Sequence, residues 1–226
     1  MKSTLVGARC WIGLGMILVF APLMLADDTL TDRIYNSKEV YQELTNTPDK
    51  GVPDSLLKGC RCVAVIPHVV KAAFVVGGRH GRGIVSCRNA EGRWSPIAFL
   101  TVSGGSLGFQ IGAQTTDLVL FIMSEKGAKS LLKSEFTIGA DVSAAAGPVG
   151  RTASASTDIR LNADIYAYSR AKGLFAGISL EGASITPDEK AVREFYGAEL
   201  SPETLLFRQE APKVPEAAMA FIKILP

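Results

Sequence analysis

The sequence predicts an α+β protein, built on a mainly antiparallel, glycine-rich sheet that can take a barrel-like form, with flanking N- and C-terminal helices. Between residues 61 and 180, short apolar and β-branched runs alternate with glycine-rich turns, as is typical of strands. Both ends of the chain instead show helical periodicity. Of the 226 residues, 47% are hydrophobic and 20% charged, which suffices for a core and excludes a disordered chain.

Residues 1–26 are predicted to be a signal peptide. Lys2 and Arg9 precede an apolar run from Trp11 to Leu25, and Ala26 ends that run. Such a run rises only about 22 Å as a helix, short of the roughly 30 Å core of a bilayer, so a retained anchor is the less favoured alternative. We expect residues 27–226 to form a single exported domain, periplasmic or extracellular and peripheral to a membrane.

The charge balance argues against nucleic-acid binding. Without Lys2 and Arg9, the 24 basic residues fall to the same number as the 22 acidic ones. Because the mature chain is near neutral, it lacks the overall basic surface of a nucleic-acid-binding protein. Any anion-binding role must come from a local cluster.

Helices are predicted at both ends of the chain and once between the strands. Residues 28–44 form an amphipathic pattern, with Leu30, Ile34 and Leu44 on one side. Mixed charges on its polar side favour packing against the protein's own domain over contact with a membrane. Further helices are expected at Pro53–Leu57, Ser124–Lys133, Thr186–Tyr196, from Ser201, and at Pro215–Leu225.

Strands are expected through the middle of the chain. They are predicted at Cys62–Ile66, Ala72–Val76, Ile84–Arg88, Trp94–Val102, Phe109–Ala113, Leu118–Met123, Phe136–Ala146, Arg151–Thr157, Ile159–Tyr168 and Leu174–Leu180. The glycine-dense segment Gly77–Gly83 is predicted to be a hairpin loop, because glycine readily adopts positive φ angles.

Three cysteines follow the signal segment. Cys60 and Cys62 would face the same side of a strand, so they cannot easily bond to each other, whereas one of them could meet Cys87 across a hairpin. Burial as small hydrophobic residues is the alternative. Only His68 and His80 could complete a zinc site, and their spacing does not suggest a ligand set, so no metal or cofactor is expected.

Catalytic signatures are missing from the sequence. It contains no G-x-S-x-G elbow, no phosphate-binding P-loop and no dinucleotide-binding glycine motif. Acidic residues near predicted strand ends could in principle form a hydrolase pair, but turns commonly place aspartate there. These residues are Asp117, Asp141, Asp158 and Asp164. We therefore expect a protein that is not an enzyme.

A local basic cluster is the strongest candidate for a binding site. Lys71, Arg79, His80 and Arg82 surround the predicted glycine hairpin, and Arg170 and Lys172 flank a second turn. Glycines permit close approach to backbone N–H groups, and arginine can bind phosphate oxygens bidentately, which would suit a phospholipid headgroup. The alternative is a solvated hairpin whose glycines serve the turn alone.

The stretch YSRAKGLFAGISLEG at residues 168–182 resembles the signature of the SYLF-domain family, a lipid-binding module linked to actin in yeast. The resemblance covers nearly all of residues 53–197. It includes IPHVVKAAFVVGGRHGRGIV, WSPIAF, GFQIGAQTTDLVL, GPVGR and FYG. Its motifs fall on Lys71, Gly77, Gly78, Gly83, Trp94, Arg170, Lys172 and Gly173.

The resemblance implies binding rather than catalysis. The resulting hypothesis is an exported, non-catalytic lipid-binding protein that contacts anionic phospholipid headgroups or a membrane surface. Export argues against actin as a partner. The alternative is a structural or interaction module that binds a protein of the cell envelope or self-associates.

Overall fold

The computed structural model describes residues 29–47, 52–73, 76–107, 112–149, 162–171 and 174–226. This part of the chain has the predicted α+β fold, in which one nine-stranded sheet is flanked by helices. The predicted signal peptide, the predicted strand Arg151–Thr157 and the candidate residue Lys172 lie outside the described residues.

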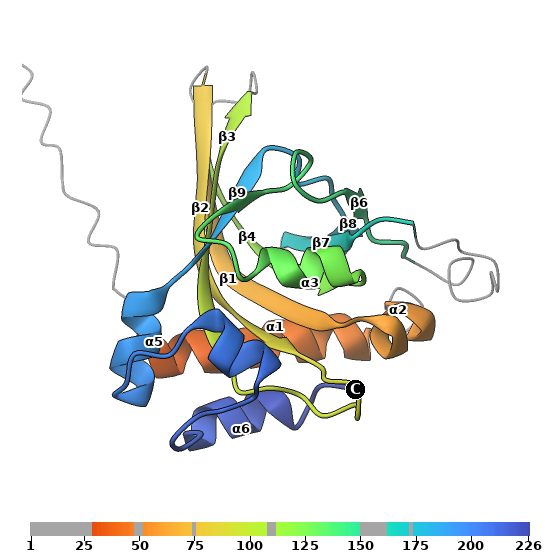
Figure 1. The fold of residues 1–226 in the computed structure, drawn as a ribbon. Helices are drawn as coiled ribbons and strands as arrows, with labels where there is room; N and C mark the ends of the chain where they lie inside the picture. The colour runs from red at the N-terminus through yellow and green to blue at the C-terminus, as the bar shows by residue number, and fades with distance from the viewer. Residues whose placement is uncertain (1–28, 48–51, 74–75, 108–111, 150–161, 172–173) are drawn as a thin grey trace, which may run out of the picture.

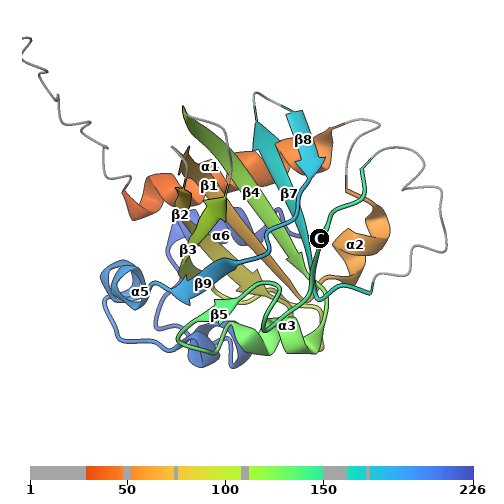
Figure 2. The ribbon, with the colours of Figure 1, turned by 90° about the horizontal axis from the view of Figure 1, so that it is seen from above.

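The sheet is almost entirely antiparallel and strongly curved (Figure 2). Its order is β5-β9-β3-β2-β1-β4-β7-β6, and β8 also pairs with β7. β6 and β7 form the parallel pair. The strands are β1 Cys62–Ala73, β2 Val76–Cys87, β3 Ala98–Leu107, β4 Gly112–Ile122, β5 Phe136–Thr137, β6 Ala144–Ala146, β7 Ile165–Ala171, β8 Leu174–Gly177 and β9 Ala183–Pro187.

Helices gather around one end of the central strands. They are α1 Leu30–Asn46, α2 Asp54–Gly59, α3 Glu125–Ser130, α5 Glu189–Tyr196, the π-helix η1 Glu203–Phe207 and α6 Glu216–Ile222. In Figure 1, α1, α5 and α6 surround the lower ends of β2 and β3, while the other ends of these strands project away from the helices.

Helix α1 confirms the predicted amphipathic segment. Thr29 caps its start by accepting a hydrogen bond from the Asp32 backbone N–H. Tyr41, on the apolar side, packs its ring 6.4 Å from that of Phe121 on β4 and 6.2 Å from that of Phe221 on α6. The apolar side of α1 is therefore covered by the sheet and α6. This agrees with the expectation, from the mixed charges on its polar side, that the helix packs on its own domain.

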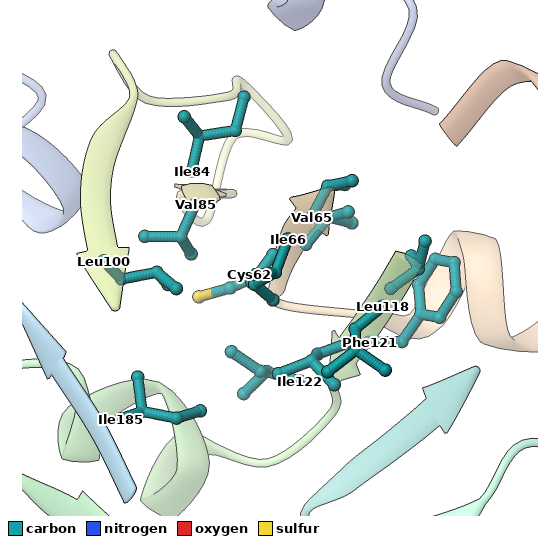
Figure 3. Close-up of a cluster of buried hydrophobic side chains, with 14 of the residues drawn as sticks. Cys62, Val65, Ile66, Ile84, Val85, Leu100, Leu118, Phe121, Ile122 and Ile185 are labelled. Carbon is teal, nitrogen blue, oxygen red and sulfur yellow. The ribbon is translucent and has the colours of Figure 1, made fainter. Parts of the chain in front are cut away.

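Alternation along the strands gives the sheet two distinct faces. The outer face, under α1, carries Phe121, whereas the inner face carries Leu118 and Ile122. In Figure 3, Ile84 and Val85, neighbours on β2, point to opposite sides of the sheet. Both side chains are buried, so the core occupies both faces at this end of the sheet.

A bulge in β1 changes which residues face inward. Before it, Ile66 lies opposite Leu118 of β4, and after it Lys71 lies opposite Gln114, a shift of one residue. His68 sits in the bulge with a positive φ of 52°. Because side chains alternate along a strand, this extra residue turns Lys71 onto the inner face instead of the outer one.

The predicted hairpin loop at Gly77–Gly83 is wrong, because these residues belong to strand β2. A Cβ atom at Gly83 would overlap the carbonyl oxygen of Val65, and one at Gly81 would lie 2.6 Å from the Val69 side chain. The glycines therefore allow β1 to approach β2 closely. Close approach of two backbones is a reason for glycine in strands that differs from the turn predicted here.

Other boundaries also differ from the predictions. The strand predicted at Cys62–Ile66 extends to Ala73, and the one predicted at Trp94–Val102 is Ala98–Leu107. Thr186 is not a helix cap, because it lies within β9, a strand that the sequence analysis missed. Asp188 instead caps α5 by accepting from Ala191 N–H. The predicted strand Phe136–Ala146 is two short strands, because Gly139 makes a turn with φ 94°.

Each of the two interpretations of the cysteines holds for part of the set, since two form a disulfide and one is a buried free thiol. Cys62 and Cys87 face each other on β1 and β2 and form a disulfide, with Cα atoms 4.0 Å apart. Cys60 is a buried free thiol. Its Sγ donates a hydrogen bond to the Leu57 carbonyl oxygen, and burial raises its pKa to about 11.

Candidate functional site

The predicted basic residues divide between the two faces of the sheet. Lys71 of β1 lies directly opposite Arg79 of β2, on the inner face. His80 and Arg82 alternate with Arg79 along β2 and therefore face the other side. Arg170 also lies on the outer side, opposite Asp117 of β4. The structure thus brings together Lys71 and Arg79, and separates them from the other described candidates.

Lys71 and Arg79 line a groove of about 330 Å³ on the inner face. Apart from these two cations, the described residues that line it are neutral. Gln114, Thr116, Ser169 and Ser179 are its polar members. No acidic residue stands among the described residues of this lining, so none of them compensates the two charges.

Neither cation has a partner among the described residues. Lys71 is exposed and Arg79 is half-buried, and neither forms a salt bridge or side-chain hydrogen bond there. The Nε atom of Arg79 is buried without a hydrogen-bond partner. Opposed residues on paired strands have Cβ atoms about 5 Å apart, so the two charges repel each other. A bound anion between the two side chains would relieve this repulsion.

The groove is amphiphilic across the strands. Lys71 and Arg79 occupy β1 and β2, whereas Leu174 and Ala176 lie on β8 at the far side of β4 and β7. Leu174 is 67% exposed, the highest value among the exposed large hydrophobic residues of the described chain. The site therefore has a cationic side and an apolar side.

Arg170 is occupied by structural contacts. Its Nε donates to Asp117 Oδ2 at 2.7 Å, and its Nη1 forms an ion pair with Glu43 of α1. Its guanidinium also lies 5.8 Å from the Phe175 ring centre. These contacts connect α1, β4, β7 and β8, so Arg170 fixes the outer side of the sheet.

Asp117 connects Arg170 to the bulge in β1. Its Oδ1 accepts a hydrogen bond from the His68 backbone N–H at 2.9 Å, and its side chain is nearly buried. The bulge sets the inward direction of Lys71, so Asp117 supports the candidate site from the opposite face. Sequence analysis treated this residue as an ordinary strand-end aspartate, and only the tertiary pairing reveals its role.

Arg82 lies at a different cavity, between α5 and the start of α1. This cavity, about 700 Å³, is lined by basic and acidic side chains in equal number. They are Arg33, Arg82, Lys190, Asp188, Glu189 and Glu194. Arg33 Nη1 lies 3.5 Å from Asp188 Oδ2. The mixed charge sets this cavity apart from the groove, where cations stand alone.

Other signature motifs build the fold. The Trp94 indole N–H donates to the Pro226 carbonyl oxygen at 2.7 Å, and Arg88 stacks 4.8 Å from the same ring system. The Tyr168 hydroxyl donates to the Pro148 carbonyl oxygen, and burial raises the pKa of Tyr168. Gly147 leaves the space that the Tyr168 ring fills.

The described part of the chain shows neither a metal-binding cluster nor a membrane-spanning helix. Within the described ranges, no three His, Cys, Asp or Glu side chains are placed to hold a metal ion together. No helix in the same part of the chain has the length and apolar character needed to cross a bilayer.

Comparison with known proteins places this architecture in a family. The family model described as Ysc84, Las17-binding protein actin regulator, matches residues 103–226. Protein YSC84 of Saccharomyces cerevisiae is 37% identical over 182 residues, covering 78% of this chain and 38% of the yeast protein.

Vertebrate proteins named after YSC84 are also similar to this chain. SH3 domain-containing YSC84-like protein 1 of Xenopus laevis is 38% identical over 153 residues, covering 67% of this chain and 45% of that protein. The human protein of the same name is 32% identical over 170 residues, covering 74% and 49%. The chain spans about half, or less, of the length of these relatives. Since the family model matches more than half of the chain, and the signature motifs agree with it, the chain belongs to the Ysc84 family, whose domain is the SYLF domain.

Proposed function

We propose that this protein is an exported, non-catalytic lipid-binding protein that contacts anionic phospholipid headgroups at a membrane surface. The observation that carries the proposal is the pair Lys71 and Arg79, which has no partner among the described residues and lies in a groove with no acid in its described lining. The exposed Leu174 on the same groove offers an apolar contact beside the charges.

The expected binding is electrostatic and moderate. Each basic side chain near an anionic membrane contributes about 1 kcal/mol, and salt screens this attraction. The guanidinium of Arg79 can hold two phosphate oxygens, whereas Lys71 acts as a point charge. Binding should therefore depend on the anionic lipid fraction and weaken as salt rises.

Two features support export. The sequence of residues 1–26 has the three-part pattern of a signal peptide. The Cys62–Cys87 disulfide is typical of proteins from oxidising compartments, such as the periplasm or the extracellular space. We propose that residues 27–226 act there, bound peripherally to a membrane.

Vesicle flotation tests the proposed function. Residues 27–226 are floated with phosphatidylcholine vesicles containing increasing phosphatidylglycerol, at low and at physiological salt. We expect recovery to rise with phosphatidylglycerol and to be lost in the double variant Lys71→Gln/Arg79→Gln. The matched control, His80→Gln/Arg82→Gln, changes the other face of the same strand and should float as the unchanged protein does. Equal flotation of both double variants would refute the site.

A protein partner is the second candidate function. The family description names Las17 binding, and LAS seventeen-binding protein 3 of Saccharomyces cerevisiae is 35% identical over 182 residues. For an exported chain, the corresponding proposal is an interaction module for an envelope protein or for a second copy. Absence of flotation, with cross-linking to a defined protein, would make this function the leading one.

A further inference from the structure

We propose that the inner-face groove takes up one molecule of an anionic, single-chain amphiphile. Its acidic head would lie between Lys71 and Arg79, and its hydrocarbon chain would extend across β4 and β7 toward β8. This inference rests on the proposed function and goes further, because it assigns the groove as a site for one lipid molecule in addition to contact with a membrane surface.

The size of the groove fits one small ligand. Its volume of about 330 Å³ is at the lower end of the range of ligand pockets, roughly 300–1,000 Å³. A diacyl phospholipid would be too large to be enclosed there. A single hydrocarbon chain with a compact head suits a groove of this size.

The order of strands gives the groove a direction. Crossing the sheet from β2 to β8, the lining changes from Arg79 and Lys71, through Gln114, to Ser169 and then to Ala176 and Leu174. The two charges therefore lie at the β2 side, and the lining beyond them mixes neutral polar residues with apolar ones, up to the exposed Leu174. This arrangement is complementary to a molecule with one anionic end and one apolar end.

The head is expected to be anionic because of the unpaired cations. The buried Nε of Arg79 lacks an acceptor within the described chain, and Lys71 faces it from the paired strand. A carboxylate or phosphate group between the two side chains would reduce the repulsion between the two cations. A cationic amphiphile would add a third positive charge instead.

Small side chains keep the groove open. Ser169, Ala171 and Ala176 line it where β7 pairs with β8. Ala176 is exposed, so a larger residue at this position should fill the groove without disturbing the core. The variant Ala176→Phe should therefore block the hydrocarbon chain while leaving Lys71 and Arg79 in place.

Titration calorimetry with dodecanoate, kept below its critical micelle concentration, tests the inference directly. We expect one dodecanoate to bind per protein, and we expect no measurable heat from dodecyltrimethylammonium or from butyrate. The first control keeps the chain and reverses the charge, whereas the second keeps the head and shortens the chain. Equal binding of dodecyltrimethylammonium would overturn the inference.

Variants separate this inference from the proposed function. We expect Ala176→Phe to lose dodecanoate affinity at least tenfold yet still float with phosphatidylglycerol vesicles, and Lys71→Gln/Arg79→Gln to lose both. Ala90→Phe, at an exposed turn, is the matched control for the added ring and should keep both. If the unchanged protein floats with vesicles but does not bind dodecanoate, the groove site alone is refuted. If it neither floats nor binds dodecanoate, both proposals are refuted.

Discussion

Arg170 and Arg79 occupy opposite faces of the same sheet and differ in every contact that matters for binding. The guanidinium of Arg170 is surrounded by two carboxylates and a phenyl ring. The Nε of Arg79 is buried without a partner, and no described residue that lines its groove is acidic. Both residues lie in motifs of the family, so a signature arginine indicates a ligand site only where its surroundings leave it unpaired.

The two faces are nevertheless connected. Arg170 holds Asp117, Asp117 accepts from the His68 N–H, and the bulge at His68 turns Lys71 inward. A structural ion pair on one face therefore helps to define the cation pair on the other. This connection can be broken at several points, and the expected effects decrease in the following order.

The largest effect is expected at the close approach of β1 to β2. Gly83→Ala should lower the free energy of unfolding by about 4 kcal/mol, because its Cβ would overlap the Val65 carbonyl oxygen and backbone cannot move as a side chain does. Urea unfolding measures this loss. Gly78→Ala, on the same strand, has its nearest neighbour at 4.0 Å and should change stability by less than about 1 kcal/mol. Similar losses in both variants would contradict this account.

Breaking the outer ion pair should have the next largest effect. Arg170→Gln leaves the nearly buried Asp117 carboxylate with the His68 N–H alone, which should cost about 2–3 kcal/mol. The exposed pair of Arg193 with Glu199 provides a matched control, since Arg193→Gln should cost less than about 1 kcal/mol. Equal losses, measured by the same unfolding method, would show that the Arg170 contacts are ordinary surface pairs.

Cys60, a buried free thiol between α2 and β1, offers a third test. Desolvation raises the pKa of Cys60 from 9.0 to about 11, so the folded state resists loss of this proton. The stabilisation is complete below pH 9.0 and is lost as pH rises to about 11, a decrease of about 2 kcal/mol. Cys60→Ala should lack this part of the alkaline decrease. A variant with the same pH dependence as the unchanged protein would show that the thiol does not contribute.

The sequence predicts where the helices and strands lie better than it predicts which face of the sheet each side chain occupies. Apolar periodicity locates α1, and β-branched runs locate the central strands, because these patterns are local. The glycines of β2 were misread as a loop, since a close approach of two strands and a turn both favour glycine. The bulge at His68 has no sequence signal of its own, yet it decides that Lys71 joins Arg79 and not Arg82. The grouping of the basic residues therefore could not be derived without the register.

The smallest effect gives the sharpest test, because stability and binding should change in opposite directions. Lys71 and Arg79 are like charges on paired strand positions, which destabilises the unliganded protein. Lys71→Gln should therefore raise the free energy of unfolding by about 0.5 kcal/mol at low salt, with the gain falling as salt screens the repulsion. The same change should weaken vesicle binding, because one of the two cations is gone. Arg82→Gln, with the same loss of charge on the other face, should not weaken binding. If Lys71→Gln lowered stability and left binding intact, Lys71 would be a structural residue and the groove would lose half of its proposed anion site.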